Sequence, residues 1–129
     1  MTSCVCLIIA LLIITKLCDT LSTLYRIENA CSETNPIARY LMHRIGINKT
    51  VWVFFALAFI IIATVGIIAI KSGRTIQALF IIGGALISAI QGAVSYNNMT
   101  GRENIITRYI RGFFSRFRRI IKSGFHLIA

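Results

Sequence analysis

Two ionisable side chains lie within the first long apolar stretch of the chain. Lys16 and Asp19 are three residues apart, and Thr23 follows Asp19 by four, so a helix would place all three on one face. Ionisable residues inside a membrane span usually point inward and pair. One interpretation is a structural pair near the interface, with the lysine reaching toward the headgroups. The other is an ion or proton site, which is less favoured because a single acid and a single base are visible.

A second polar group follows in the stretch after the first apolar segment. Asn35 is a good N-cap and Pro36 suits the first position of a helix. Glu33 lies just before them, where the partial positive charge of a helix N-terminus favours an acid. We expect a short helix over residues 36–45 that ends at Gly46 in the left-handed conformation. Ten residues are too few to span a bilayer, so this helix should lie at the membrane surface.

The two polar groups together form the pattern D-x3-T-x9-E-x-N-P, carried by Asp19, Thr23, Glu33, Asn35 and Pro36, with Lys49 just before the next apolar run. This pattern resembles a family of small, mostly prokaryotic, three-span membrane proteins with no established activity. The resemblance covers about residues 19–96. It implies the three-span architecture and singles out the motif residues, but it implies no activity. Lys16, beside Asp19, is not part of the family pattern, and its positive charge argues against a simple acidic ion site at Asp19.

The spacing also predicts how the two groups meet. Hydrogen bonds from Asp19 and Thr23 to the loop at Glu33 would hold that loop over the helix bundle as a structural latch. The alternative is that the same polar groups form a binding site.

Long apolar runs are the elements that must position these groups. Residues 51–70 carry no charge, and twenty helical residues at about 1.5 Å each cover a bilayer core of about 30 Å. We expect three spans, over about residues 4–25, 50–71 and 75–97. The first is expected to be a retained span, because no Lys or Arg precedes it as in a signal peptide. The predicted fold is an all-α integral membrane protein.

The third span carries small residues at regular spacing. Gly84, Ser88 and Gly92 recur every four residues, and Gln91 adds a hydrogen-bonding group near them. Small residues let helix backbones approach closely. Packing within the three-helix bundle and docking to another subunit are both open interpretations of this ridge.

The last part of the chain predicts a basic amphipathic helix. We divide the chain into a transmembrane domain over residues 1–101 and this tail over residues 102–129. Apolar residues repeat there at three- and four-residue steps, and the rest of the helix is largely basic, through Arg108, Arg111, Arg116, Arg118, Arg119 and Lys122. Such a helix suits the interface of an anionic membrane. A calmodulin-type target, a nucleic-acid arm and a membrane-disrupting peptide are the alternatives.

Composition narrows the function classes. The chain has 129 residues, 57% of them hydrophobic, and a net charge of +10 from 14 basic and 4 acidic residues. Because most basic residues flank or follow apolar runs, anionic lipid is a better partner than nucleic acid. The four cysteines form no CxxC and neither histidine has ligand spacing from them, so we expect no metal and no cofactor. No catalytic set of residues is visible, so we expect no enzyme.

Charge also predicts the orientation. The first loop and the tail share one side of the membrane and hold most of the basic residues, whereas the turn between the second and third spans holds Lys71 and Arg74. The positive-inside rule predicts an outside N-terminus and a cytoplasmic C-terminus. The expected function is an accessory or assembly subunit of a membrane complex. The alternatives are a small homo-oligomeric transporter or channel that uses Lys16, Asp19 and Thr23, and a lipid-binding or membrane-perturbing protein that acts through its tail.

Overall fold

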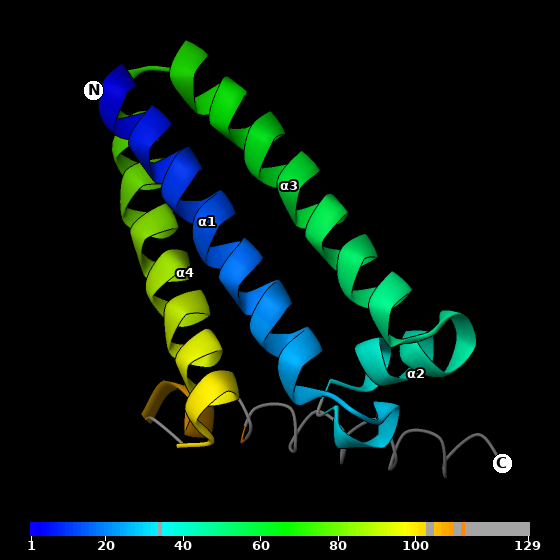
Figure 1. The fold of residues 1–129 in the computed structure, drawn as a ribbon. Helices are drawn as coiled ribbons and strands as arrows, with labels where there is room; N and C mark the ends of the chain where they lie inside the picture. The colour runs from blue at the N-terminus through cyan, green and yellow to red at the C-terminus, as the bar shows by residue number, and fades with distance from the viewer. Residues whose placement is uncertain (34, 103–104, 110–111, 113–129) are drawn as a thin grey trace, which may run out of the picture.

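The chain forms an all-α structure. A computed structural model describes residues 1–33, 35–102, 105–109 and 112, and no strand occurs among them. Three long helices make up most of this part, and a short helix and a 3-10 turn connect the first two (Figure 1). Their bounds are α1 Thr2–Arg26, η1 Ala30–Ser32, α2 Pro36–Ile45, α3 Ile47–Lys71 and α4 Arg74–Thr100.

The three long helices fit membrane spans. They contain 25, 25 and 27 residues, and each has a strongly apolar window with few charges. At about 1.5 Å per residue, each is longer than a hydrocarbon core of about 30 Å. The protein is therefore a multi-pass membrane protein, as the sequence predicts. The expected limits differ by up to three residues, because α3 begins at Ile47 and α4 continues to Thr100.

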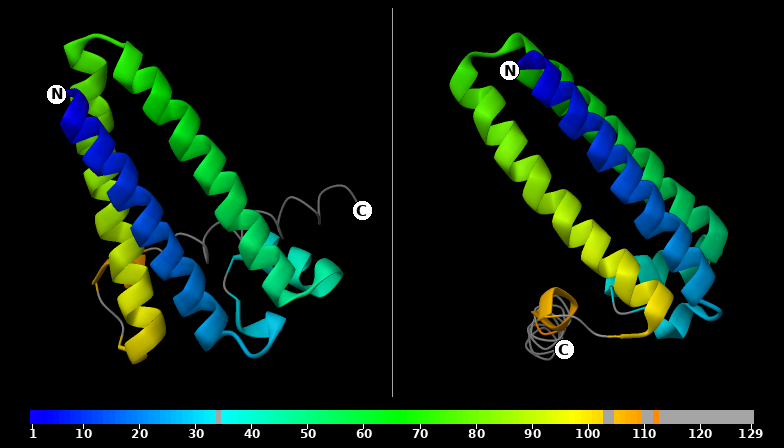
Figure 2. Two further views of the ribbon diagram at one scale, coloured as in Figure 1. Left: turned by 45° about the horizontal axis from the view of Figure 1, so that its top comes forward. Right: turned by 60° about the vertical axis from the view of Figure 1, so that its left-hand side comes forward.

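Helix α1 lies between α3 and α4, which diverge from the short turn that joins them (Figures 1 and 2). Near this turn the packing is tight. A Cβ added at Gly84 would clash with Cγ2 of Ile8 and lie 3.3 Å from Cδ1 of Leu12, and one at Gly66 would clash with the side chain of Ile9. The bundle is thus closed around the first half of α1 and opens toward the other end.

Local signals define α2. The side chain of Asn35 accepts hydrogen bonds from the backbone N–H of Ile37 at 3.0 Å and of Ala38 at 3.5 Å, and Pro36 begins the helix. The expected left-handed cap at Gly46 is wrong in one respect. Its φ of 91° is positive, but its ψ of 158° is extended. Gly46 also precedes α3 directly, so the extended ψ turns the chain into the next helix, in a region that essentially only glycine occupies.

The predicted tail lies mostly outside the described residues. Gly101 ends α4 in the left-handed conformation, and residues 105–109 are helical, with Arg108 exposed. Arg102 is also described and exposed, whereas the other basic residues of the tail lie outside the described part, namely Arg111, Arg116, Arg118, Arg119 and Lys122. The amphipathic tail helix over 102–129 stays a prediction.

Candidate functional site

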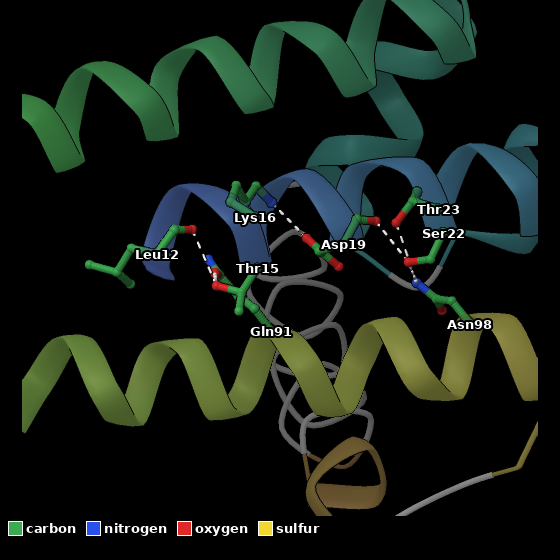
Figure 3. Close-up of polar contacts among 8 residues, drawn as sticks. All are labelled: Leu12, Thr15, Lys16, Asp19, Ser22, Thr23, Gln91 and Asn98. Atoms are coloured by element: carbon green, nitrogen blue, oxygen red, sulfur yellow. Dashed lines mark hydrogen bonds and ion pairs between the residues drawn. The ribbon is translucent and has the colours of Figure 1, made fainter. Parts of the chain in front are cut away.

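The ionisable pair of α1 is formed as predicted. Lys16 Nζ donates to Asp19 Oδ2 at 2.7 Å, and the two side chains are 20% and 17% exposed (Figure 3). Lys16 lies ten residues, or about 15 Å of helix, from the end of α1 at Arg26. That distance is about half the thickness of the hydrocarbon core. The interfacial position expected for a structural pair stays a prediction.

A direct polar contact joins α1 to α4 at nearly the same level. The Thr15 hydroxyl donates to Oε1 of Gln91 at 2.7 Å and also lies 3.2 Å from the carbonyl of Leu12 (Figure 3). Gln91 thus bonds to α1 inside the bundle. Interhelical bonds of this kind contribute about 0.6 kcal/mol on average in membrane proteins.

Asn98 makes a second polar junction between these helices, which sequence reasoning missed. Its Nδ2 donates to the hydroxyls of Ser22 and Thr23 at 3.4 and 3.3 Å, and its Oδ1 accepts from Arg26 Nη1 at 2.7 Å. Asn98 follows Gln91 by seven residues, so the two share one face of α4. That spacing was the signal available in the sequence.

The loop before α2 is held by its own residues. Oε1 of Glu33 accepts from the backbone N–H of Asn35 at 2.8 Å, and the Arg39 guanidinium donates to the backbone carbonyl of Glu33. The latch expected from Asp19 and Thr23 is not formed by hydrogen bonds among the described residues. Helix α1 continues beyond Asp19 and Thr23 to Arg26. Asp19 therefore lies about 10 Å along the helix axis from the end of α1, where the loop begins.

These polar groups nevertheless line one cleft, of about 630 Å³. Helices α1, α2, α3 and α4 and the loop before α2 all contribute to its wall. The polar lining consists of Lys16, Asp19, Thr20, Thr23, Arg26, Glu33, Asn35, Gln91 and Asn98. The apolar lining from α3 includes Phe54, Leu57, Ala58 and Ile61. The structure thus brings together most of the predicted polar positions, whereas Lys49 lies elsewhere, at the start of α3.

Charge in the cleft is balanced. Lys16 and Arg26 contribute two positive charges, and Asp19 and Glu33 contribute two negative charges. Thr20 also lines the cleft, is only 2% exposed, and its hydroxyl has no hydrogen-bond partner in the described part of the chain. Its hydroxyl oxygen is closed off from solvent, so it offers no contact to an occupant of the cleft. A neutral or zwitterionic polar occupant fits this lining.

The small-residue ridge of α4 divides into two parts. Gly84 and Ser88 are buried, and Gly84 faces Ile8 of α1. Gly92 is exposed, and a Cβ added there would meet nothing within 4 Å. The first part therefore serves packing within the bundle, and Gly92 is open to a neighbour.

Metal-ligating side chains do not gather in the described residues. No group of three His, Cys, Asp or Glu side chains lies close enough to hold an ion there. Outside the cleft, Cys31 Sγ and His43 Nε2 approach to 3.9 Å in an exposed contact between the loop and α2.

Comparison with known proteins found no match to a family model, a curated protein or a solved structure. The resemblance carried by the D-x3-T and E-x-N-P motifs therefore stays a prediction. Functional inference rests on the cleft itself.

Proposed function

We propose that this protein is a non-catalytic accessory or assembly subunit of a larger membrane complex, in which another membrane-spanning helix covers the cleft. The observation that carries the proposal is the polar wall around Lys16 and Asp19, which faces an open cleft about 10–15 Å along α1 from the end of this span. Lipid tails offer no hydrogen bonds, so polar groups at this depth require cover from protein or water.

The splay between α3 and α4 supports this proposal. The two helices separate away from their turn (Figure 2). The cleft is open between residues of α1, α3 and α4, so the described part of the chain does not close it. Because the charges in the cleft balance, the covering helix need not carry a charge. A span with hydroxyl or amide side chains on one face would cover the open side of the cleft and shield the Lys16–Asp19 pair from lipid.

Photo-crosslinking in the native membrane tests the proposal. A photoreactive amino acid replaces Leu57, which lines the cleft and is 51% exposed. The matched control is Ile60 on the same helix, which is 60% exposed and does not line the cleft. We expect a discrete adduct with another membrane polypeptide from position 57 and only lipid adducts from position 60. Lipid adducts alone from both positions would contradict the proposal.

A homo-oligomeric transporter or channel is the second candidate. The depth of the Lys16–Asp19 pair favours it, because ionisable pairs at this depth often mark ion or proton pathways. Three helices are too few to enclose a pore, so this candidate needs several copies of the chain. Flux into liposomes that is lost in Asp19→Asn, with folding retained, would support it over the accessory subunit.

The orientation is a further part of the proposal. One end of the bundle, beside α2, carries several basic residues, and the opposite end carries two at the turn between α3 and α4 (Figure 1). The first group comprises Arg26, Arg39, Arg44, Lys49 and Arg102; the second comprises Lys71 and Arg74. The positive-inside rule favours the α2 end in the cytoplasm and the N-terminus outside. Labelling of a cysteine placed at Lys71 by an impermeant reagent from outside the cell tests this.

Anionic lipid is the proposed partner of the tail. Arg108 is exposed on the helical segment 105–109, next to the same end of the bundle. Each basic residue near an anionic surface contributes about 1 kcal/mol to binding. Truncation after Gly101 should weaken the binding of the protein to anionic vesicles and leave the three spans intact. An unchanged effect would argue against a lipid-binding role for the tail.

A further inference from the structure

We propose that the cleft is an aqueous vestibule, through which water and small hydrophilic solutes reach the Lys16–Asp19 pair from the end of the bundle near Arg26 and Glu33. This inference concerns what fills the cleft. It does not depend on which protein covers its side, so it goes beyond the proposed function.

The Lys16–Asp19 pair has hydrogen-bonding capacity that the described residues leave unused. Among the described residues, the Lys16 ammonium uses one of its three N–H donors, to Asp19 Oδ2, and the second carboxylate oxygen of Asp19 has no partner. An acyl chain in the cleft would leave these charged groups short of partners, at a cost above the about 1–3 kcal/mol of an unpaired neutral group.

The size and the polar lining of the cleft suit water. A water molecule occupies about 30 Å³ of liquid, so a cleft of about 630 Å³ has room for on the order of twenty. Ordered water needs two to four polar partners. Lys16 and Asp19 lie together on α1, and Asn98 of α4 contacts Ser22, Thr23 and Arg26 farther along that helix, so water along the cleft finds such partners.

The vestibule is closed at its deep end. The Thr15–Gln91 bond joins α1 to α4 near the level of Lys16. Beyond this level Gly84 packs directly against Ile8, which leaves no room for water. In the other direction polar groups continue through Thr23 to the loop end of the bundle. Solutes would therefore reach the middle of the membrane from one side only.

Two alanines of α3 provide matched probes. Ala58 lines the cleft and is partly buried, whereas Ala56 is exposed and does not line it. They are two residues apart, so they differ by about 3 Å in depth and point to nearly opposite sides of the helix. A thiol reacts as the thiolate, which forms in water and not in hydrocarbon. Cysteines at the two positions should therefore report the solvent on each face.

The experiment uses the full chain in native membranes, with Cys4, Cys6, Cys18 and Cys31 replaced by alanine. Ala58→Cys and Ala56→Cys are each exposed to a charged, membrane-impermeant methanethiosulfonate. We expect Ala58→Cys to react at least about tenfold faster than Ala56→Cys, and only with reagent added on the side of Arg26. Val94→Cys, which lines the cleft from α4, serves as a second probe with the same expected result.

Equal and slow reaction at cysteines 56, 58 and 94 would overturn the vestibule, because the cleft would then hold lipid or a tightly packed helix. Faster reaction from the opposite side would overturn it as well. Photo-crosslinking from position 57 detects a partner protein, whereas the cysteine reactions detect water. Failure of the vestibule and failure of the proposed subunit role are therefore distinguishable. Unfolding midpoints equal to that of the cysteine-free parent confirm that each variant is folded.

Discussion

Replacing Gly84 by alanine tests the tight packing that closes the deep end of the cleft. Its neighbour Gly83 is the control, since a Cβ added there meets nothing within 4 Å. At Gly84 the added Cβ meets the Cγ2 methyl of Ile8 and lies 3.3 Å from Cδ1 of Leu12. This methyl is on the branched carbon of isoleucine, whose χ1 is strongly restricted in a helix, so it cannot easily rotate away.

The expected magnitudes follow from two opposing effects. Alanine is more favourable than glycine in a helix by about 1 kcal/mol, and this gain applies to both positions. Overpacking by one methyl group typically costs about 1–3 kcal/mol, and this cost applies only to Gly84. Gly83→Ala should therefore raise the free energy of unfolding by up to about 1 kcal/mol, whereas Gly84→Ala should lower it by up to about 2 kcal/mol.

Reversible unfolding in mixtures of mild detergent and dodecyl sulfate, followed by circular dichroism, measures both changes. The difference between the variants is more informative than either value, because helix propensity cancels. A difference of about 1–3 kcal/mol supports the close approach of α1 and α4. Equal shifts in the two variants would refute the reasoning, because they would mean that Gly84 does not face α1.

The same assay tests three other features. Asp19→Asn leaves Lys16 without its charged partner at membrane depth and should destabilise by up to about 3 kcal/mol, with recovery when Lys16→Met is added; no recovery would argue against the pair. Asn35→Ala removes the N-cap of α2 and should cost about 1 kcal/mol, whereas an unchanged midpoint would mean that the cap is dispensable. Gly46→Ala forces a side chain into a conformation that only glycine adopts readily and should cost about 1–3 kcal/mol; a neutral effect would contradict the positive φ.

Much of the fold could be predicted because its signals are local. The limits of α2 follow from Asn35 and Pro36 at one end and Gly46 at the other, and the observed helix has the predicted bounds. Hydropathy and length identify the spans. The Lys16–Asp19 contact follows from the three-residue spacing within one helix.

The cleft could not be predicted, because it depends on how far α3 diverges from α4. Nothing in one-dimensional spacing specifies that angle. The role of Asn98 in joining α1 to α4 was also missed, although Asn98 lies seven residues after Gln91 on the same face of α4. The ridge of α4 shows the same limit. The sequence places Gly84 and Gly92 on one stripe, but only the packing separates a glycine against Ile8 from one that is open.

The central claim is that the chain is an incomplete bundle whose cleft is covered in the membrane by another protein. Its most direct test is gentle detergent extraction of the native membrane followed by native mass spectrometry. The account predicts a discrete complex in which this chain and a different membrane polypeptide are present at fixed stoichiometry. A monomer or a homo-oligomer alone would contradict it and would favour the transporter, with Asp19 and Lys16 as the first residues to replace in flux measurements.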